Sequence, residues 1–228
     1  MIAFDRPGHG YTDIFSNSAA TLEAQSRLFF KAAEKLGIED AYLVGYSYGG
    51  ALSLNMALTY PEFVKGLVLV SSVAMPWPGE IDMNYRLMSK PVFGPALMSL
   101  GTAFLGDDYF RSSYKGIFTP HPEPDGFMDH VGVNMTVRVK SFVENSKQLN
   151  TLRPQIVEQS QNYPYLKMPI ELIHGQDDTS VPISIHAEEF IKIVPHSNLV
   201  RIPDIRHALM QLRPDSVIEA IKRVTTSR

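Results

Sequence analysis

Ser47 lies in a Gly-x-Ser-x-Gly segment at residues 45–49. A serine hydroxyl is a weak nucleophile at neutral pH, so it attacks a carbonyl carbon only with help from a base and from a group that orients the base. Because an apolar run at 41–44 precedes Ser47 and helix-favouring residues follow it, the segment predicts a sharp turn from a strand into a helix. Gly45 and Gly49 are expected to leave room for the strand and the helix to approach. The alternative is a glycine-rich turn with a purely structural use.

Candidates for the base and the orienting acid lie nearer the other end of the chain. Asp177 and Asp178 follow an apolar run at 169–173, and His207 follows another at 199–202. Because the carboxyl ends of parallel strands meet at one edge of a sheet, these side chains are expected close to the serine. Along the chain, the serine comes first, the acid second and the histidine third.

Six further histidines compete with His207 for the role of base, and their positions argue against them. His174 precedes the acid-bearing turn and is expected to pack structurally. His9 lies in the first loop, and His121 and His130 lie in the central region. His186 and His196 lie in and just after a predicted helix.

Strand-like and helix-like runs alternate along most of the chain, which predicts an α/β fold with a parallel sheet and right-handed crossovers. One helix is expected to begin after Thr21, its N-cap, and to stop at Gly37. The remaining expected elements are strands at 1–5, 41–44, 66–70, 169–173 and 199–202, and helices at 51–60, 182–194 and 214–224.

This alternation stops between residues 73 and 167, where proline-rich joints separate short helical stretches. We interpret this region as a helical cap or lid that lines an apolar pocket, between two parts of a core at 1–72 and 168–228. Its methionine and aromatic side chains include Met83, Tyr85, Met88, Phe93, Met98, Phe104, Tyr109 and Phe110.

These motifs resemble the α/β-hydrolase family, in which a Gly-x-Ser-x-Gly elbow, an acid and a histidine follow one another in this order. The likeness extends to residues 4–10, Phe-Asp-Arg-Pro-Gly-His-Gly, which match the family's fourth strand and the loop after it. It also includes residues 174–182, where the family pattern His-Gly-x-x-Asp-x-x-Val-Pro aligns its acid with Asp178 and not with Asp177. His9 lies one strand later than the family's His-Gly oxyanion loop.

The resemblance implies an α/β-hydrolase fold with Ser47 as nucleophile, His207 as base and Asp178 as orienting acid. The backbone N–H of Tyr48 would help to hold the oxyanion. The family's first three strands, and the loop that donates a second oxyanion N–H, have no counterpart here. Residues 1–5 therefore lead us to expect either a longer protein with upstream strands or a degenerate chain with an exposed sheet edge.

The function that these residues predict is a serine hydrolase acting on a small or medium apolar ester, lactone or related acyl compound. Hydrolysis of carbon–carbon bonds is an alternative chemistry, and a non-catalytic ligand-binding protein is an alternative from another class. No metal or organic cofactor is implied. The partner expected from this reading is a small apolar substrate.

The composition of the chain argues against nucleic acid and membrane-spanning segments. The chain of 228 residues has a net charge of -3, which gives no basic field for nucleic acid. No apolar run reaches the ~20 residues that span a bilayer. With no cysteine, neither disulfides nor thiolate metal sites are available, so the cellular compartment stays open, with the cytoplasm as default. Nothing in the sequence specifies an oligomeric state.

Overall fold

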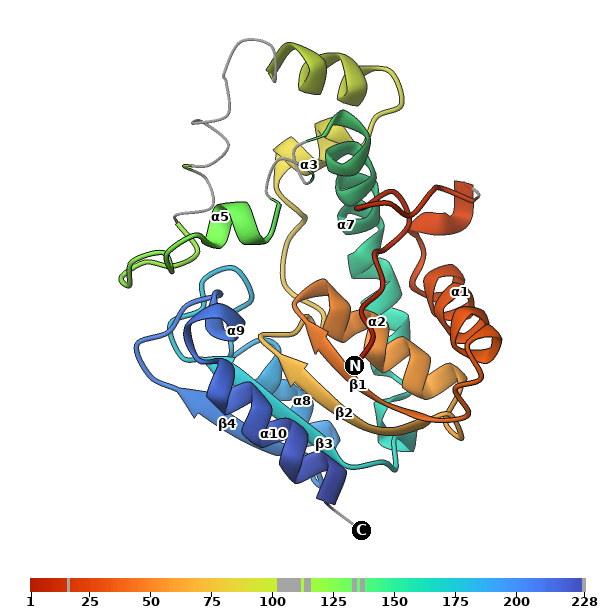
Figure 1. Ribbon diagram of the computed structural model, residues 1–228, viewed down its shortest axis with the longest axis vertical. Helices are drawn as coiled ribbons and strands as arrows, with labels where there is room; N and C mark the ends of the chain where they lie inside the picture. Colours follow the sequence, from red (N-terminus) through yellow and green to blue (C-terminus); the bar gives the residue numbers. More distant parts are fainter. Residues whose placement is uncertain (16, 102–111, 113–115, 133–134, 136–137, 227–228) are drawn as a thin grey trace.

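The computed structural model describes residues 1–15, 17–101, 112, 116–132, 135 and 138–226, and these form a layered α/β structure (Figure 1). Its sheet contains four parallel strands in the order β1-β2-β3-β4. The strands are β1 Ala41–Tyr46, β2 Val64–Val70, β3 Ile170–Gly175 and β4 Asn198–Ile202. The predicted parallel sheet is therefore confirmed.

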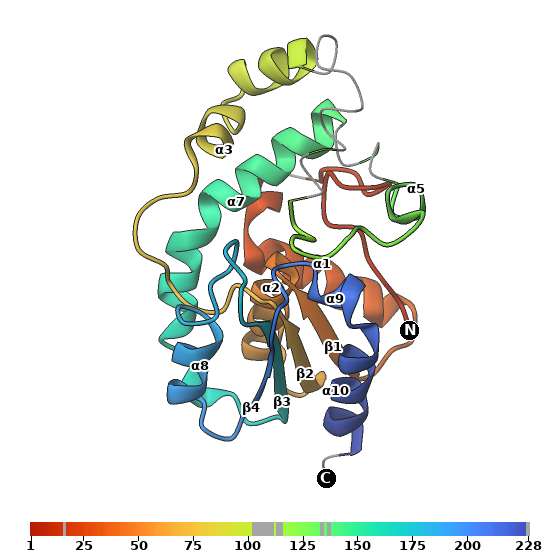
Figure 2. The same cartoon turned by 90° about the vertical axis from the view of Figure 1, so that its left-hand side faces the viewer.

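Helices cover both faces of the sheet (Figures 1 and 2). One face packs on α10 and α9, where Val68, Ile173 and Ala220 belong to one apolar cluster. The larger apolar cluster lies on the other face and includes α1, α2 and α8. The core helices are α1 Leu22–Lys35, α2 Tyr48–Thr59, α8 Ala187–Ile193, α9 Leu209–Leu212 and α10 Pro214–Thr226, with a short 3-10 turn η1 at Asn17–Ala20.

The ends of α1 follow from its local sequence. The Thr21 hydroxyl accepts a hydrogen bond from the backbone N–H of Ala24 at 3.2 Å, as an N-cap does. Gly37 adopts a positive φ of 72° just after the helix, which suits glycine and ends the helix. Both predicted boundaries are confirmed.

The expected strand at residues 1–5 is wrong, because this segment has no strand conformation. A strand needs a neighbour that accepts its backbone hydrogen bonds, and among the described residues β1 pairs only with β2. The apolar side chains Ile2 and Phe4 are exposed, although the Phe4 ring stacks on Phe29 of α1 with centroids 5.4 Å apart. The edge of β1 is apolar as well, since Tyr42 and Val44 are exposed there.

The described part of the region between residues 73 and 167 contains helices and no strand. The helices are α3 Met83–Met88, α5 Phe127–His130 and α7 Val139–Ser160, with a short 3-10 turn η2 at Tyr163–Tyr165 and a further helical stretch at 93–101. In Figures 1 and 2, α3, α5 and the amino-terminal end of α7 lie beyond the carboxyl ends of the strands, while the rest of α7 runs down beside the core. The role of this region as a lid, and the boundaries of the three parts, stay predictions. Phe104, Tyr109 and Phe110 lie outside the described residues.

The carboxyl-terminal half of α7 packs with the core. Leu152 and Ile156 are buried in the same apolar cluster as α2. The Gln159 amide donates to the carbonyl oxygen of Ala51 at 3.2 Å and to the Tyr163 hydroxyl at 3.0 Å, and it accepts from the Asn55 amide at 2.9 Å. Three groups therefore hold this end of α7 against α2 and η2.

Candidate active site

Ser47 sits at a strained turn between β1 and α2. Its backbone has φ 53° and ψ -119°, which a non-glycine residue rarely adopts. A Cβ added to Gly45 would lie 2.5 Å from the carbonyl oxygen of Gly49, and one added to Gly50 would lie 2.0 Å from the Ser72 hydroxyl. The expected elbow is present, but the close approach depends on Gly45 and Gly50. The expectation for Gly49 is wrong, because a Cβ there would meet nothing within 4 Å.

The structure brings Ser47, His207 and Asp178 into one chain of hydrogen bonds. His207 Nδ1 lies 2.8 Å from Asp178 Oδ2, and His207 Nε2 lies 3.1 Å from Ser47 Oγ. A carboxylate only accepts, so Nδ1 carries the proton and donates it to this bond. Nε2 of the neutral ring is then an acceptor for the serine hydroxyl. This arrangement lets the imidazole receive a proton from Ser47.

Asp178 and Asp177 differ sharply in their surroundings. The Asp178 side chain is inaccessible to solvent, whereas Asp177 is exposed. Besides the bond from His207, Asp178 accepts backbone N–H bonds at Oδ1 from Ser180 and Val181, both at 2.9 Å. These bonds fix the orientation of the carboxylate. Of the two carboxylates, Asp178 is the one that contacts His207.

His207 is also held through its backbone. The Tyr46 hydroxyl donates a hydrogen bond to the His207 carbonyl oxygen at 2.8 Å, and the two ring centroids are 5.0 Å apart. Burial, together with the negative charge of Asp178, raises the pKa of Tyr46, so this hydroxyl stays protonated and remains a donor. Tyr46 is the residue of the serine motif whose part in the site could not be read from the sequence, because its partner lies 161 residues away.

Two buried histidines lie behind Asp178. His174 Nε2 donates to the carbonyl oxygen of Val181 at 2.7 Å and lies 3.6 Å from Asp178 Oδ2. His186 Nδ1 accepts from the backbone N–H of Met75 at 3.2 Å. Burial lowers the pKa of His174, and burial and then His174 lower the pKa of His186 to about 4. Both rings are therefore neutral near pH 7 and act as packed structural groups, as was expected of His174.

The other histidines have different surroundings from His207. His121 lies 2.6 Å from the carbonyl oxygen of Asp204, and the His9 ring contacts Arg6 and the carbonyl oxygen of Pro7. His130 and His196 are exposed. Among the described residues, His207 is the histidine hydrogen-bonded to Ser47.

Tyr48 places its backbone N–H in the first turn of α2, where helix geometry provides no intrahelical acceptor. This N–H is the predicted oxyanion donor, and its role stays a prediction. The side chain of Tyr48 is buried and receives a hydrogen bond from Gln25 at 3.1 Å. The Arg6 guanidinium lies over the Tyr48 ring, 4.1 Å from its centroid.

The sequence predicts Arg6 only as part of a loop. In the structure its guanidinium donates to Gln148 at 2.6 Å and to Asn145 at 3.1 Å, so it ties the first loop to α7. Burial lowers the pKa of Arg6 below its ordinary value. The nearest signal in the sequence was the loop motif itself, which does not reveal a partner on a helix far along the chain.

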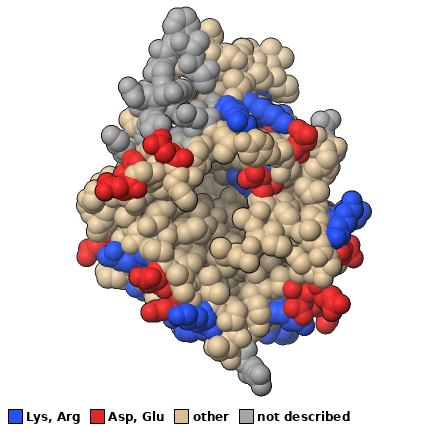
Figure 3. Space-filling view, viewed as in Figure 1, with Lys and Arg blue, Asp and Glu red and all other residues tan. Residues whose placement is uncertain are grey.

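Within the described residues, no cluster of three or more histidine and carboxylate side chains is arranged to hold a metal ion, and no helix is long and apolar enough to cross a membrane. The face seen in Figure 3 is hollowed near its centre. Most of the surface around this opening is neither Lys or Arg nor Asp or Glu, although both kinds reach its upper edge.

Comparison with known proteins agrees with this fold. The model of the alpha/beta hydrolase fold matches residues 1–214, so the chain belongs to the α/β-hydrolase fold family. It is similar to two 2-hydroxy-6-oxononadienedioate/2-hydroxy-6-oxononatrienedioate hydrolases. It is 28% identical to the protein of Paraburkholderia phymatum over 200 residues and 25% identical to that of Klebsiella pneumoniae over 195 residues. The alignments cover 81% and 80% of the chain but 62% of each relative, so the chain spans less than two thirds of their length.

Solved structures show the same fold. The 2-hydroxy-6-oxo-6-phenylhexa-2,4-dienoate hydrolase of a Rhodococcus strain superimposes with a TM-score of 0.76 at 18% identity, covering 98% of this chain and 78% of that one. An enol-lactonase of Burkholderia xenovorans gives a TM-score of 0.70 at 18% identity and covers 98% and 79% of the two chains.

Proposed function

We propose that the protein is a serine hydrolase that cleaves an acyl compound through a covalent acyl-enzyme. Ser47 Oγ attacks the carbonyl carbon while His207 Nε2 takes the serine proton. Asp178 keeps the imidazole in the required tautomer and stabilises its positive charge. The negative charge that develops on the carbonyl oxygen is held by the Tyr48 N–H.

The rest of the cycle uses the same groups. The protonated His207 gives its proton to the leaving group, and the bond between the carbonyl carbon and the leaving group breaks. His207 then takes a proton from a water molecule, whose oxygen attacks the acyl carbon. The ester bond to Ser47 breaks, the proton returns to Ser47 Oγ, and a carboxylic acid leaves.

The observation that carries this proposal is the unbroken chain of hydrogen bonds from Ser47 Oγ through His207 to Asp178. A protein that only binds a ligand has no need for a base and an orienting acid beside a serine at a strained turn. We infer a small or medium apolar ester or lactone as substrate, the class that the sequence predicts.

Carbon–carbon bond hydrolysis is a second candidate, favoured by the names of the curated relatives. Those relatives are called hydrolases of 2-hydroxy-6-oxo dienedioates and trienedioates. Attack at a ketone carbon, followed by loss of a stabilised carbanion, uses the same nucleophile and base. The two candidates therefore differ in the leaving group and not in the roles of Ser47, His207 and Asp178.

A fluorophosphonate probe tests the shared chemistry. The parent chain is expected to take the label at Ser47, while Ser47→Ala and His207→Ala are expected to lose labelling. His196→Ala is the matched control, because His196 is exposed and should leave labelling intact. Labelling of Ser47→Ala at the parental rate would refute the nucleophile, and full labelling of His207→Ala would refute the base. An unlabelled parent chain would favour the non-catalytic alternative.

Substrate class is tested by rates on two panels. One contains p-nitrophenyl esters of increasing acyl length, and the other contains 2-hydroxy-6-oxo dienoates. Faster hydrolysis of longer esters than of acetate would support the apolar substrate. Turnover of the dienoates with little ester hydrolysis would move the assignment to carbon–carbon bonds.

A further inference from the structure

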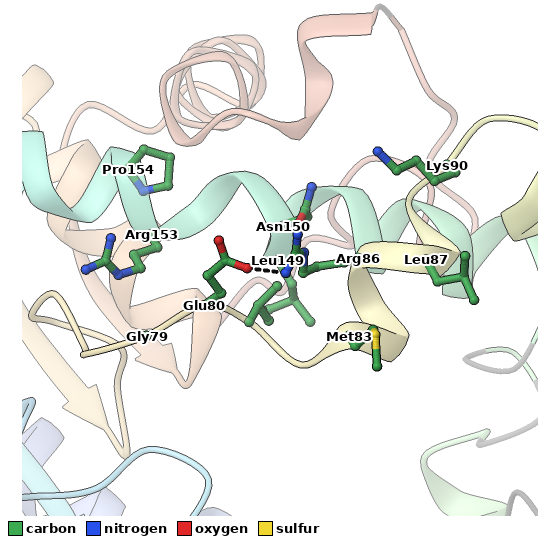
Figure 4. Close-up of a pocket in the computed structure, with 11 residues that line it drawn as sticks. Gly79, Glu80, Met83, Arg86, Leu87, Lys90, Leu149, Asn150, Arg153 and Pro154 are labelled. Carbon is green, nitrogen blue, oxygen red and sulfur yellow. Dashed lines mark hydrogen bonds and ion pairs between the residues drawn. The ribbon is translucent and has the colours of Figure 1, made fainter.

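A groove between α3 and α7 lies apart from the catalytic residues. It has a volume of about 610 Å³, within the ~300–1,000 Å³ range of small-molecule sites. Its apolar surface comes from Ile81, Met83, Leu87 and Leu149. Figure 4 shows the lining side chains on the segments before and after α3, on α3 and on the facing side of α7. None of them belongs to the proposed catalytic chain.

The charges that line this groove are unequal. It contains the cations Arg86, Lys90 and Arg153 but a single carboxylate, Glu80. Glu80 is paired with Arg86, as the dashed line in Figure 4 marks. Arg153 donates through Nε to the backbone carbonyl oxygen of Trp77 at 2.8 Å. Among the described residues, the Lys90 ammonium and the two terminal nitrogens of Arg153 have no hydrogen-bond or ion-pair partner.

An apolar groove with two unpaired cations at its margin suits a molecule with an apolar tail and a compact anionic head. Burial of the tail against Met83 and Leu87, which are exposed in the free protein, removes apolar surface from water. The head group would accept hydrogen bonds from the ammonium and the guanidinium. A neutral molecule would gain only the first of these contributions, and a cationic one would be repelled.

We propose that the groove between α3 and α7 is a binding site for an amphiphilic anion, distinct from the catalytic site. This inference does not depend on the proposed function. Contacts connect the groove with Trp77, because Arg153 donates to the carbonyl oxygen of Trp77 and the Trp77 ring lies 6.1 Å from the ring of His186.

Trp77 provides a direct readout, since it is the single tryptophan of the chain. Its fluorescence is measured during titration with octanoate, with octyl phosphate and with the neutral analogue octanol. A head group that contacts two partly exposed cations is expected to bind roughly tenfold more tightly than octanol. Higher salt should reduce this difference, because exposed charges are screened.

Lys90→Met tests the location, because it removes the charge and keeps an apolar stem. The affinity for the anions is expected to fall about threefold while that for octanol changes little. Lys222→Met on α10 is the matched control, since this lysine is also exposed but lies away from the groove. Binding of one anion and not the other would still support the site and would select carboxylate or phosphate as its head group.

Two results would overturn the proposal. One is equal affinity for octanol and for both anions in the parent chain. The other is anion binding that Lys90→Met leaves unchanged, which would place the anion elsewhere. Circular dichroism of the variants checks that they fold as the parent does.

Discussion

Two adjacent glycines in the first turn of α2 should respond in opposite ways to the same substitution. At Gly50 an added Cβ lies 2.0 Å from Oγ and 2.2 Å from Cβ of Ser72, and 3.2 Å from its Cα. Rotation of the serine hydroxyl relieves only the first of these contacts, so the backbone must move. At Gly49 an added Cβ meets nothing within 4 Å.

The magnitudes follow from these contacts. Gly50→Ala places a methyl group in a buried, filled space, and such overpacking costs typically ~1–3 kcal/mol. It also disturbs Ser72, whose hydroxyl donates to the carbonyl oxygen of Gly45 at 2.9 Å beneath the serine turn. Gly49→Ala restricts the unfolded chain without a clash, and should stabilise by ~0.4–1 kcal/mol. For a chain of this length the melting temperature should move by roughly 2–4 °C per kcal/mol.

Thermal and urea unfolding, monitored by circular dichroism, measure the difference in stability between the parent and each of the two variants. Gly50→Ala is expected to lower the melting temperature and to reduce fluorophosphonate labelling of Ser47, because it shifts the turn that carries the serine. Gly49→Ala is expected to raise the melting temperature slightly. Equal destabilisation by both substitutions, or a stable Gly50→Ala variant, would refute the packing at this turn.

Asp178→Asn is expected to lower turnover about 10³–10⁴-fold, because His207 loses the carboxylate that fixes its tautomer, whereas Asp177→Asn at an exposed position should change it less than about twofold. Hydrolysis rates of a p-nitrophenyl ester measure both, and the reverse ranking would assign the acid to Asp177. The pKa of His186 is lowered to about 4 from its ordinary 6.5, so between these pH values the unfolded chain binds a proton that the folded chain does not. The stability contributed by His186 is therefore present above pH 6.5 and is lost as the pH falls toward 4, by up to about 1.4 kcal/mol per pH unit. His186→Gln, whose amide oxygen can still accept the Met75 N–H, removes this titration. As the pH falls from 6.5 to 4, the urea midpoint of this variant should therefore fall less steeply than that of the parent. An equal dependence on pH in both proteins would contradict the argument from burial.

The arrangement of the sheet followed from the sequence because each element carried its own signal. Apolar runs of strand length alternated with helical patterns, and parallel strands of this kind end at one edge. This logic placed Ser47, Asp178 and His207 near one another, and the structure finds them hydrogen-bonded. Their catalytic roles stay predictions.

Other features depend on neighbours that a linear pattern does not reveal. Residues 1–5 have the composition of a strand, but a strand forms only beside a partner. Gly50, and not Gly49, makes the close approach because Ser72 comes from the segment after β2. Arg6 meets α7 only through the folded arrangement of segments 142 positions apart.

The contacts that α7 makes with the core determine which part of this helix can bend. Its carboxyl-terminal end is fixed by the three hydrogen bonds of Gln159 and by the burial of Ile156, so this end moves with α2 and the sheet. Pro154 lies inside the helix and has no backbone N–H to donate, so the ladder of hydrogen bonds is interrupted there. A bend of α7 at Pro154 would therefore break no backbone hydrogen bond donated by that residue and would leave the bonds of Gln159 intact, but it would also have to accommodate Leu152, which is buried in the same core cluster.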